Sequence, residues 1–198
     1  MRRFVLSAVL VLCIASPRFI FAQAATGGGD HVEVGAFADY FRLGRTSPTL
    51  NYAGLGGRLA FNLRPSAQIE GEMAYDFDRS FTNVFSNGVS EQLVASKTHI
   101  LHALVGPKLQ TPGRFRLFAT GKVGLISFTT NNQSPTPGFK SALGAVGNGN
   151  SKFALYPGGG VEGFFGPIGL RMEVGDDIYF DNGARNNLRV TFGPTFRF

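Results

Sequence analysis

The sequence predicts an all-β protein, an eight-stranded antiparallel up-and-down transmembrane β-barrel preceded by a cleavable signal peptide. Three observations support this prediction: apolar and polar residues alternate through eight segments, charges in those segments share one face, and short and long connections alternate. Successive side chains of a strand point to opposite faces, so such a sheet has one apolar and one charged face. A closed barrel in an outer membrane accommodates both faces.

The N-terminal segment has the features of a secretory signal. Arg2 and Arg3 precede an apolar run from Phe4 to Ala15, and an A-x-A cleavage pattern ends at Ala24. The run is shorter than the roughly 20 residues that a membrane-spanning helix needs, although a retained anchor stays open as an alternative. The predicted organisation is a signal peptide (1–24), a short periplasmic lead (25–31) and an outer-membrane β-barrel (32–198).

Eight segments of the remaining chain read as strands. Each is long enough for a tilted strand to cross a bilayer, which takes about 9–11 residues. Nothing in these segments shows the 3.6-residue period of an amphipathic helix. The predicted strands cover residues 32–43, 52–63, 67–77, 98–109, 115–128, 152–165, 168–176 and 187–198.

The connections between these strands alternate strictly in length. Short connections, each with a proline, are expected at residues 64–66, 110–114 and 166–167. Longer polar connections are expected at residues 44–51, 78–97, 129–151 and 177–186. Tight periplasmic turns opposite longer surface loops are the pattern of outer-membrane barrels.

Charged residues follow the alternation. In the third predicted strand, Glu70, Glu72 and Asp76 share one parity while Ile69 and Met73 take the other. The charged face is expected to line the lumen, where charges must pair because an unpaired buried charge is costly. The predicted lumen charge network is Glu33, Asp39, Arg58, Glu70, Glu72, Arg116, Lys122, Glu162, Arg171, Glu173 and Arg189. Asp76, Lys108, Lys152 and Arg197 share this face.

A soluble barrel of the lipocalin kind is the structural alternative, since its strands also alternate but turn the apolar face inward. Three features disfavour it: the loop asymmetry, a large glycine content assigned to the apolar face, and alternation that continues to a terminal Phe198. The formal net charge of +6 falls by three if the signal is removed, and the remaining bases are dispersed among acids. No nucleic-acid partner is therefore expected.

The sequence contains no P-loop, no G-x-S-x-G motif and no metal-spaced cluster of histidine and cysteine. His99 and His102 lie three apart on one strand, hence on opposite faces. Glu70 and Glu72 share a face, and a salt-bridge network with Arg58 and Arg116 is their expected role. The sequence thus predicts no catalytic, cofactor-binding or metal-binding residue.

The chain resembles the small eight-stranded outer-membrane barrels of the OmpA and OmpX type, and their relatives known only as outer-membrane β-barrel domain proteins. Residues 56–65 running into 69–72, residues 158–162 and residues 170–174 carry the resemblance across the barrel. Phe198 resembles the C-terminal signal that the barrel-assembly machinery reads. The resemblance is specific for architecture and weak for function, because this fold hosts anchors, adhesins, small pores and a few enzymes.

These observations predict a non-enzymatic outer-membrane barrel with a filled, salt-bridged lumen and a structural or surface-interaction role through its extracellular loops. A narrow passive channel for small solutes or ions is the first alternative. A lipid-A-modifying barrel enzyme, with His99 and Ser96 as its local candidates, is the second. The expected partners are outer-membrane lipid, lipopolysaccharide and the barrel-assembly machinery, and the expected state is a monomer.

Overall fold

The computed structural model describes residues 31–44, 49–86, 89–132, 140–141, 151–181 and 183–198. The predicted signal peptide and nearly all of the predicted lead lie outside these residues. Within the described part, no helix is long and apolar enough to cross a bilayer. The strands are β1 (Val32–Leu43), β2 (Leu50–Arg64), β3 (Ala67–Ser86), β4 (Glu91–Gln110), β5 (Phe115–Asn132), β6 (Lys140–Ser141), β7 (Ser151–Phe165), β8 (Ile168–Asp176), β9 (Ile178–Phe180), β10 (Ala184–Arg185) and β11 (Leu188–Arg197).

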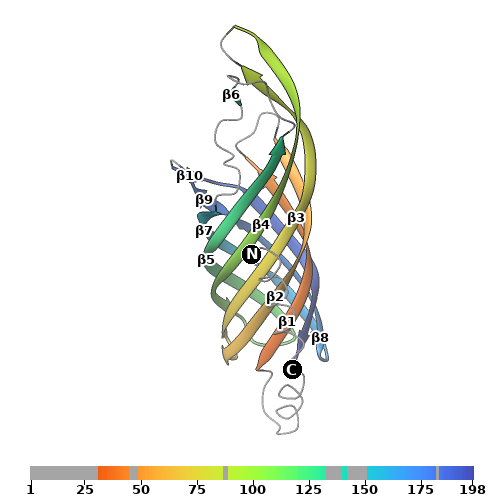
Figure 1. Ribbon diagram of the computed structural model, residues 1–198. Coiled ribbons are helices and arrows are strands. Elements are labelled where there is room, and N and C mark those ends of the chain that lie inside the picture. The colour runs from red at the N-terminus through yellow and green to blue at the C-terminus, as the bar shows by residue number, and fades with distance from the viewer. Residues whose placement is uncertain (1–30, 45–48, 87–88, 133–139, 142–150, 182) are drawn as a thin grey trace, which may run out of the picture.

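Eight of these strands close into a ring (Figure 1). The ring order is β1, β2, β3, β4, β5, β7, β8 and β11, and every neighbouring pair is antiparallel, including β11 with β1. At the closing pair Glu33 lies opposite Arg197, and the Phe198 amide donates to the Val32 carbonyl over 2.9 Å. The predicted eight-stranded antiparallel barrel is confirmed.

The two ends of the barrel differ. At one end, which we call the turn end, tight turns join β2 to β3, β4 to β5 and β7 to β8. Gly113 and Gly166 have φ angles of 117° and 67° in two of these turns, a conformation that favours glycine. The opposite end, the loop end, carries the longer connections. Figure 1 shows the C-terminus at the turn end and the longest strands reaching past the loop end.

The predicted connection over residues 78–97 is wrong. β3 and β4 continue through it as a hairpin, with pairs from Arg79 opposite Thr98 to Ser86 opposite Glu91. The register shifts between Asp76 and Arg79, so a bulge separates the hairpin from the barrel wall. The polar composition suggested a loop, but backbone pairing between two strands already in register extends a hairpin beyond the apolar segment.

Three short strands also lie within predicted connections. β6 pairs with β3, while β9 pairs with β7 beyond the point where β8 ends, through Ala154 opposite Tyr179. β10 pairs back onto β9. β9 thereby continues the barrel wall beside β7 toward the loop end, beyond the end of β8. Its Tyr179 side chain is buried in the interior.

The outward face of the ring is apolar. Val105 is 50% exposed and Phe192 54% exposed, whereas Glu70 and Arg189 on the opposite face have no exposed surface. A soluble lipocalin-like barrel would show the reverse distribution, so that alternative is wrong. Exposed apolar side chains on every strand of a closed ring are the arrangement suited to lipid.

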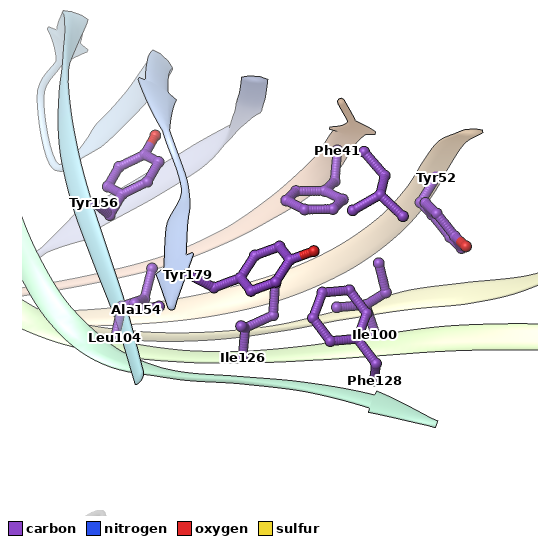
Figure 2. Packing of buried hydrophobic residues seen from close by; sticks show 10 residues of the cluster. Phe41, Tyr52, Ile100, Leu104, Ile126, Phe128, Ala154, Tyr156 and Tyr179 are labelled. Carbon is purple, nitrogen blue, oxygen red and sulfur yellow. The ribbon is translucent and has the colours of Figure 1, made fainter. Parts of the chain in front are cut away.

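The interior has an apolar zone at the loop end. Phe41, Tyr52, Ile100, Ile126, Phe128 and Tyr179 belong to one buried cluster, and Figure 2 shows them converging from different strands. The rings of Phe128 and Tyr179 lie 5.0 Å apart. These residues share the parity of the charged face, so the lumen is charged near the turn end and closed by hydrocarbon near the loop end.

The assignment of a large glycine content to the apolar face is wrong. Gly56 lies on the interior face, where an added Cβ would overlap the Phe37 ring, and at Gly175 it would overlap the Tyr156 ring. Other inward positions, such as Gly160 beside Phe118, follow the same rule. Glycine therefore makes room for aromatic rings inside a barrel that has an interior just wide enough for side chains.

Position along the outward face should decide the cost of a charge. In lipid vesicles, Val123→Arg should lower the free energy of unfolding by about 2–4 kcal/mol, because the position lies well inside the apolar band. Leu109→Arg, on the same face beside a short turn, should cost about 0–1 kcal/mol. Urea titrations of the two variants measure the difference, and equal costs would contradict the placement of Val123 at the centre of the bilayer and Leu109 at its edge.

Candidate functional site

The candidate site is the charged interior of the barrel, and its first layer lies near the turn end. Arg116 donates to Glu33 over 2.9 Å, and Lys108 donates to Glu162 over 2.9 Å. The Lys108 ammonium also lies 3.9 Å from Glu33. These side chains come from β1, β4, β5 and β7, so ion pairs in this layer join opposite walls of the barrel.

Three carboxylates surround a lysine in the middle layer. The Lys122 Nζ lies 2.7 Å from Glu70 Oε1, 2.6 Å from Glu72 Oε2 and 2.9 Å from Glu173 Oε1. All four side chains are buried. The ammonium donates hydrogen bonds to Glu72 and Glu173 and forms an ion pair with Glu70, so this lysine acts as a tethered cation for all three carboxylates.

Three arginines complete the middle layer. Arg58 donates to Glu173 over 3.1 Å, and Arg171 bridges Glu70 and Glu173. Arg189 donates to Glu72 over 2.7 Å and to both oxygens of Asp39. The planar guanidinium suits such forked pairing with carboxylates.

A histidine lies on the loop side of Arg189. His102 Nδ1 is 2.8 Å from Asp177 Oδ2, and its Nε2 is 3.1 Å from Asp76 Oδ2. All three side chains have no exposed surface. The Phe41 ring lies 5.0 Å from the imidazole, so the apolar cluster begins directly above it.

The structure places every residue of the predicted lumen network in the interior, none more than 9% exposed. Asp76 and Lys108 are buried with them. Lys152 and Arg197, at opposite ends of the barrel, are only half-buried; Lys152 pairs with Asp181 over 3.1 Å.

The predicted partners of Glu70 and Glu72 differ from the observed ones. Their ion pairs are with Lys122, Arg171 and Arg189, not with Arg58 and Arg116. Strand adjacency suggested Arg58, which lies opposite Glu72 in the ladder. Long side chains in a narrow lumen reach across it instead.

Sequence reasoning missed the surroundings of His102. Its parity in β4 matches that of buried Lys108, which indicates an inward imidazole. Asp177, however, follows β8 in a predicted connection, and nothing in its spacing indicates that it reaches β4. The ligand-capable group of Asp39, Asp76 and His102 draws on three strands, so no spacing within one segment could reveal it.

His99 lies on the outside of the barrel. Its Nδ1 is 3.0 Å from Asp78, on a partly exposed surface, and its ring lies 5.3 Å from that of Tyr75. The side chain of Ser96, the other candidate for an enzyme site, is outside the described residues. Phe198 is half exposed beside β1, at the closing pair.

Comparison with solved structures identifies other proteins with this architecture. Ail, the attachment invasion locus protein of Yersinia pestis, is similar with 14% identity and a TM-score of 0.53, over 85% of this chain and 97% of that one. Neisserial surface protein A (NspA) is similar with 8% identity and a TM-score of 0.59, over 87% of this chain and 100% of that one. The fold is that of the small outer-membrane β-barrels.

Ail has also been solved in complex with the heparin analogue sucrose octasulfate, and that structure matches with a TM-score of 0.51. No known protein-family profile matches the chain, and no curated protein sequence matches it. At these identities the similarity establishes the fold alone.

Removal of the tethered lysine should be strongly destabilising. Lys122→Met keeps the side-chain length but leaves three buried carboxylates without their shared cation, so the free energy of unfolding should fall by about 3–5 kcal/mol. Lys152→Met removes a partly exposed pair and should cost at most about 1 kcal/mol. Denaturant unfolding of both refolded variants provides the measurement, and a small cost for Lys122→Met would rule out a central role for this cluster.

Proposed function

We propose that the protein resides in the outer membrane as a closed, non-enzymatic barrel, with a structural or surface-interaction role through its loop end. The observation that carries this proposal is the combination of an outward apolar face with a filled interior. The wall suits lipid, while ion pairs and the apolar cluster occupy the lumen. The parts free to meet another molecule are then the segments beyond the loop end.

Among the described residues at the loop end, the extended β3–β4 hairpin is the longest stretch of regular pairing. It continues the wall past the bulge near Asp76 and holds its pairing to Ser86 opposite Glu91. Near its tip, Val89 is 95% exposed and Leu93 72% exposed. A paired hairpin presents such side chains at a fixed distance from the membrane. The names of the attachment protein and the surface protein with this fold are compatible with such a role.

A passive channel is less well supported. The Lys122 cluster spans the middle of the lumen, and Phe41, Ile100 and Phe128 close it toward the loop end. Purified wild-type barrel in planar bilayers should therefore show no steady conductance of porin size, and vesicles should not swell in small sugars. A porin in the same vesicles serves as the positive control. Steady, large conductance would favour the channel over the present proposal.

Orientation can be tested with one epitope at two sites. An epitope inserted between Val89 and Ser90, at the hairpin tip, should be labelled by antibody on intact cells. The same epitope inserted between Pro112 and Gly113, in a tight turn, should be labelled only after permeabilisation. Both insertions should leave a barrel that unfolds in SDS only when heated, because the ladder itself is unchanged. Surface labelling of the turn epitope would reverse the proposed orientation.

A further inference from the structure

One group of interior side chains has the geometry of a metal site. Asp39, Asp76 and His102 each offer one ligand atom, and these atoms lie within 4.8 Å of one another. All three side chains are at most 3% exposed. They belong to β1, β3 and β4, whose registers place Asp39 and Asp76 on either side of Gly54, and His102 two residues from the partner of Asp76, at the boundary between charged lumen and apolar cluster.

A second acidic group in this interior already has a cation that compensates its negative charge. Glu70, Glu72 and Glu173 also lie within ligand distance of one another, but the Lys122 ammonium contacts all three. That group has its own cation. The cluster of Glu70, Glu72 and Glu173 therefore needs no further ion from solution.

The group around His102 contains no lysine; its cations are Arg189 and, when both ring nitrogens are protonated, His102 itself. Arg189 pairs with Asp39 but is shared with Glu72. Among the described residues, the only ion-pair partner of Asp76 and of Asp177 is His102 itself. Three buried aspartates thus surround one imidazole and one shared guanidinium. A buried excess of negative charge is costly unless a further positive charge compensates it.

Two carboxylate oxygens in this region are also unsatisfied. No hydrogen bond from the described residues reaches Asp76 Oδ1 or Asp177 Oδ1, although both side chains are fully buried. Buried polar atoms without a partner are uncommon and indicate a missing ion, water or proton; among the described residues, the other such carboxylate oxygens are Glu33 Oε2 and Glu162 Oε1, in the layer near Lys108. The two orphaned oxygens belong to the two aspartates that flank His102.

The hydrogen bond of His102 to Asp177 suits metal binding. When Nδ1 donates to Asp177 over 2.8 Å, the lone pair of Nε2 faces Asp76, whose Oδ2 lies 3.1 Å away. A carboxylate that accepts from one ring nitrogen while the other binds the ion is the usual second-shell arrangement of histidine ligands. Asp177 would then be a positioning residue.

We propose that Asp39, Asp76 and His102 form a binding site for a divalent transition-metal ion, with zinc as the best match. One imidazole nitrogen and two carboxylate oxygens are zinc ligands at about 2.0–2.2 Å, and a water completes four-coordination. The bound ion ties β1, β3 and β4 together beneath the apolar cluster. This site is independent of the proposed surface role.

The test uses the full-length mature chain refolded in detergent with zinc, because the apolar cluster covers the site once the barrel is closed. After gel filtration, elemental analysis should find about one zinc per wild-type barrel. His102→Gln should lose it. His99→Gln, a matched change on the opposite face of the same strand, should retain it. Asp177→Asn should weaken zinc binding by about 10–100-fold.

A measurement on the wild-type chain tests the proposal even if some of the variants fail to fold. With ¹⁵N-labelled histidine, zinc should shift the Nε2 resonance of one imidazole, and that signal should persist in His99→Gln and His31→Gln. Absence of zinc from folded wild-type barrel, or equal zinc content in wild type and folded His102→Gln, would overturn the proposal. A zinc-dependent shift confined to His99 or His31 would assign the metal to the surface and overturn it too.

Discussion

The closed hydrogen-bond ring is the constraint on which the rest of this structure depends. Pairing of β11 with β1, and of β8 with β7, leaves no open edge among the eight ring strands. Closure satisfies the backbone within the wall, as a hydrocarbon environment requires. It also separates the side chains into two sets with opposite demands. Outward residues must be apolar, and inward residues must pack and neutralise one another in a narrow space.

The interior meets the second demand by pairing charges across the lumen. Lys122 is held by three carboxylates from strands that are not its neighbours in the ring, and Arg189 joins Asp39 on the neighbouring strand to Glu72 on a more distant one. Burying ions is costly, and only close, multiple contacts offset the cost of removing them from water. The net stabilisation from such buried pairs can be small, whereas removal of one partner is strongly destabilising because it leaves an uncompensated charge. The balance is least complete around His102, where the charged layers end.

Apolar side chains fill the lumen beyond the charged layers, and this division of the interior is relevant to function. Phe41, Ile126 and Phe128 fill the loop end of the lumen, and Tyr179 is added from β9. Inward glycines such as Gly175 make room for rings such as Tyr156. A barrel with a packed interior provides a firm base for the segments that extend beyond its loop end. In the part of the chain that the structure describes, the longest projection is the β3–β4 hairpin, whose pairing continues past the bulge.

The sequence by itself determined the fold class, the faces and most strand limits. The strand over residues 32–43 and that over 168–176 coincide with β1 and β8, because alternation and proline-containing turns are local signals. The inward position of residues such as Glu70 and Arg171 follows from the same parity. Only the tertiary structure decided the length of the hairpin, the apolar closure and the partners of each charge. Those depend on which side chains meet across the lumen: His102 and Asp76 come from the paired strands β4 and β3, but Asp177 lies beyond β8 and reaches His102 only after the ring has closed.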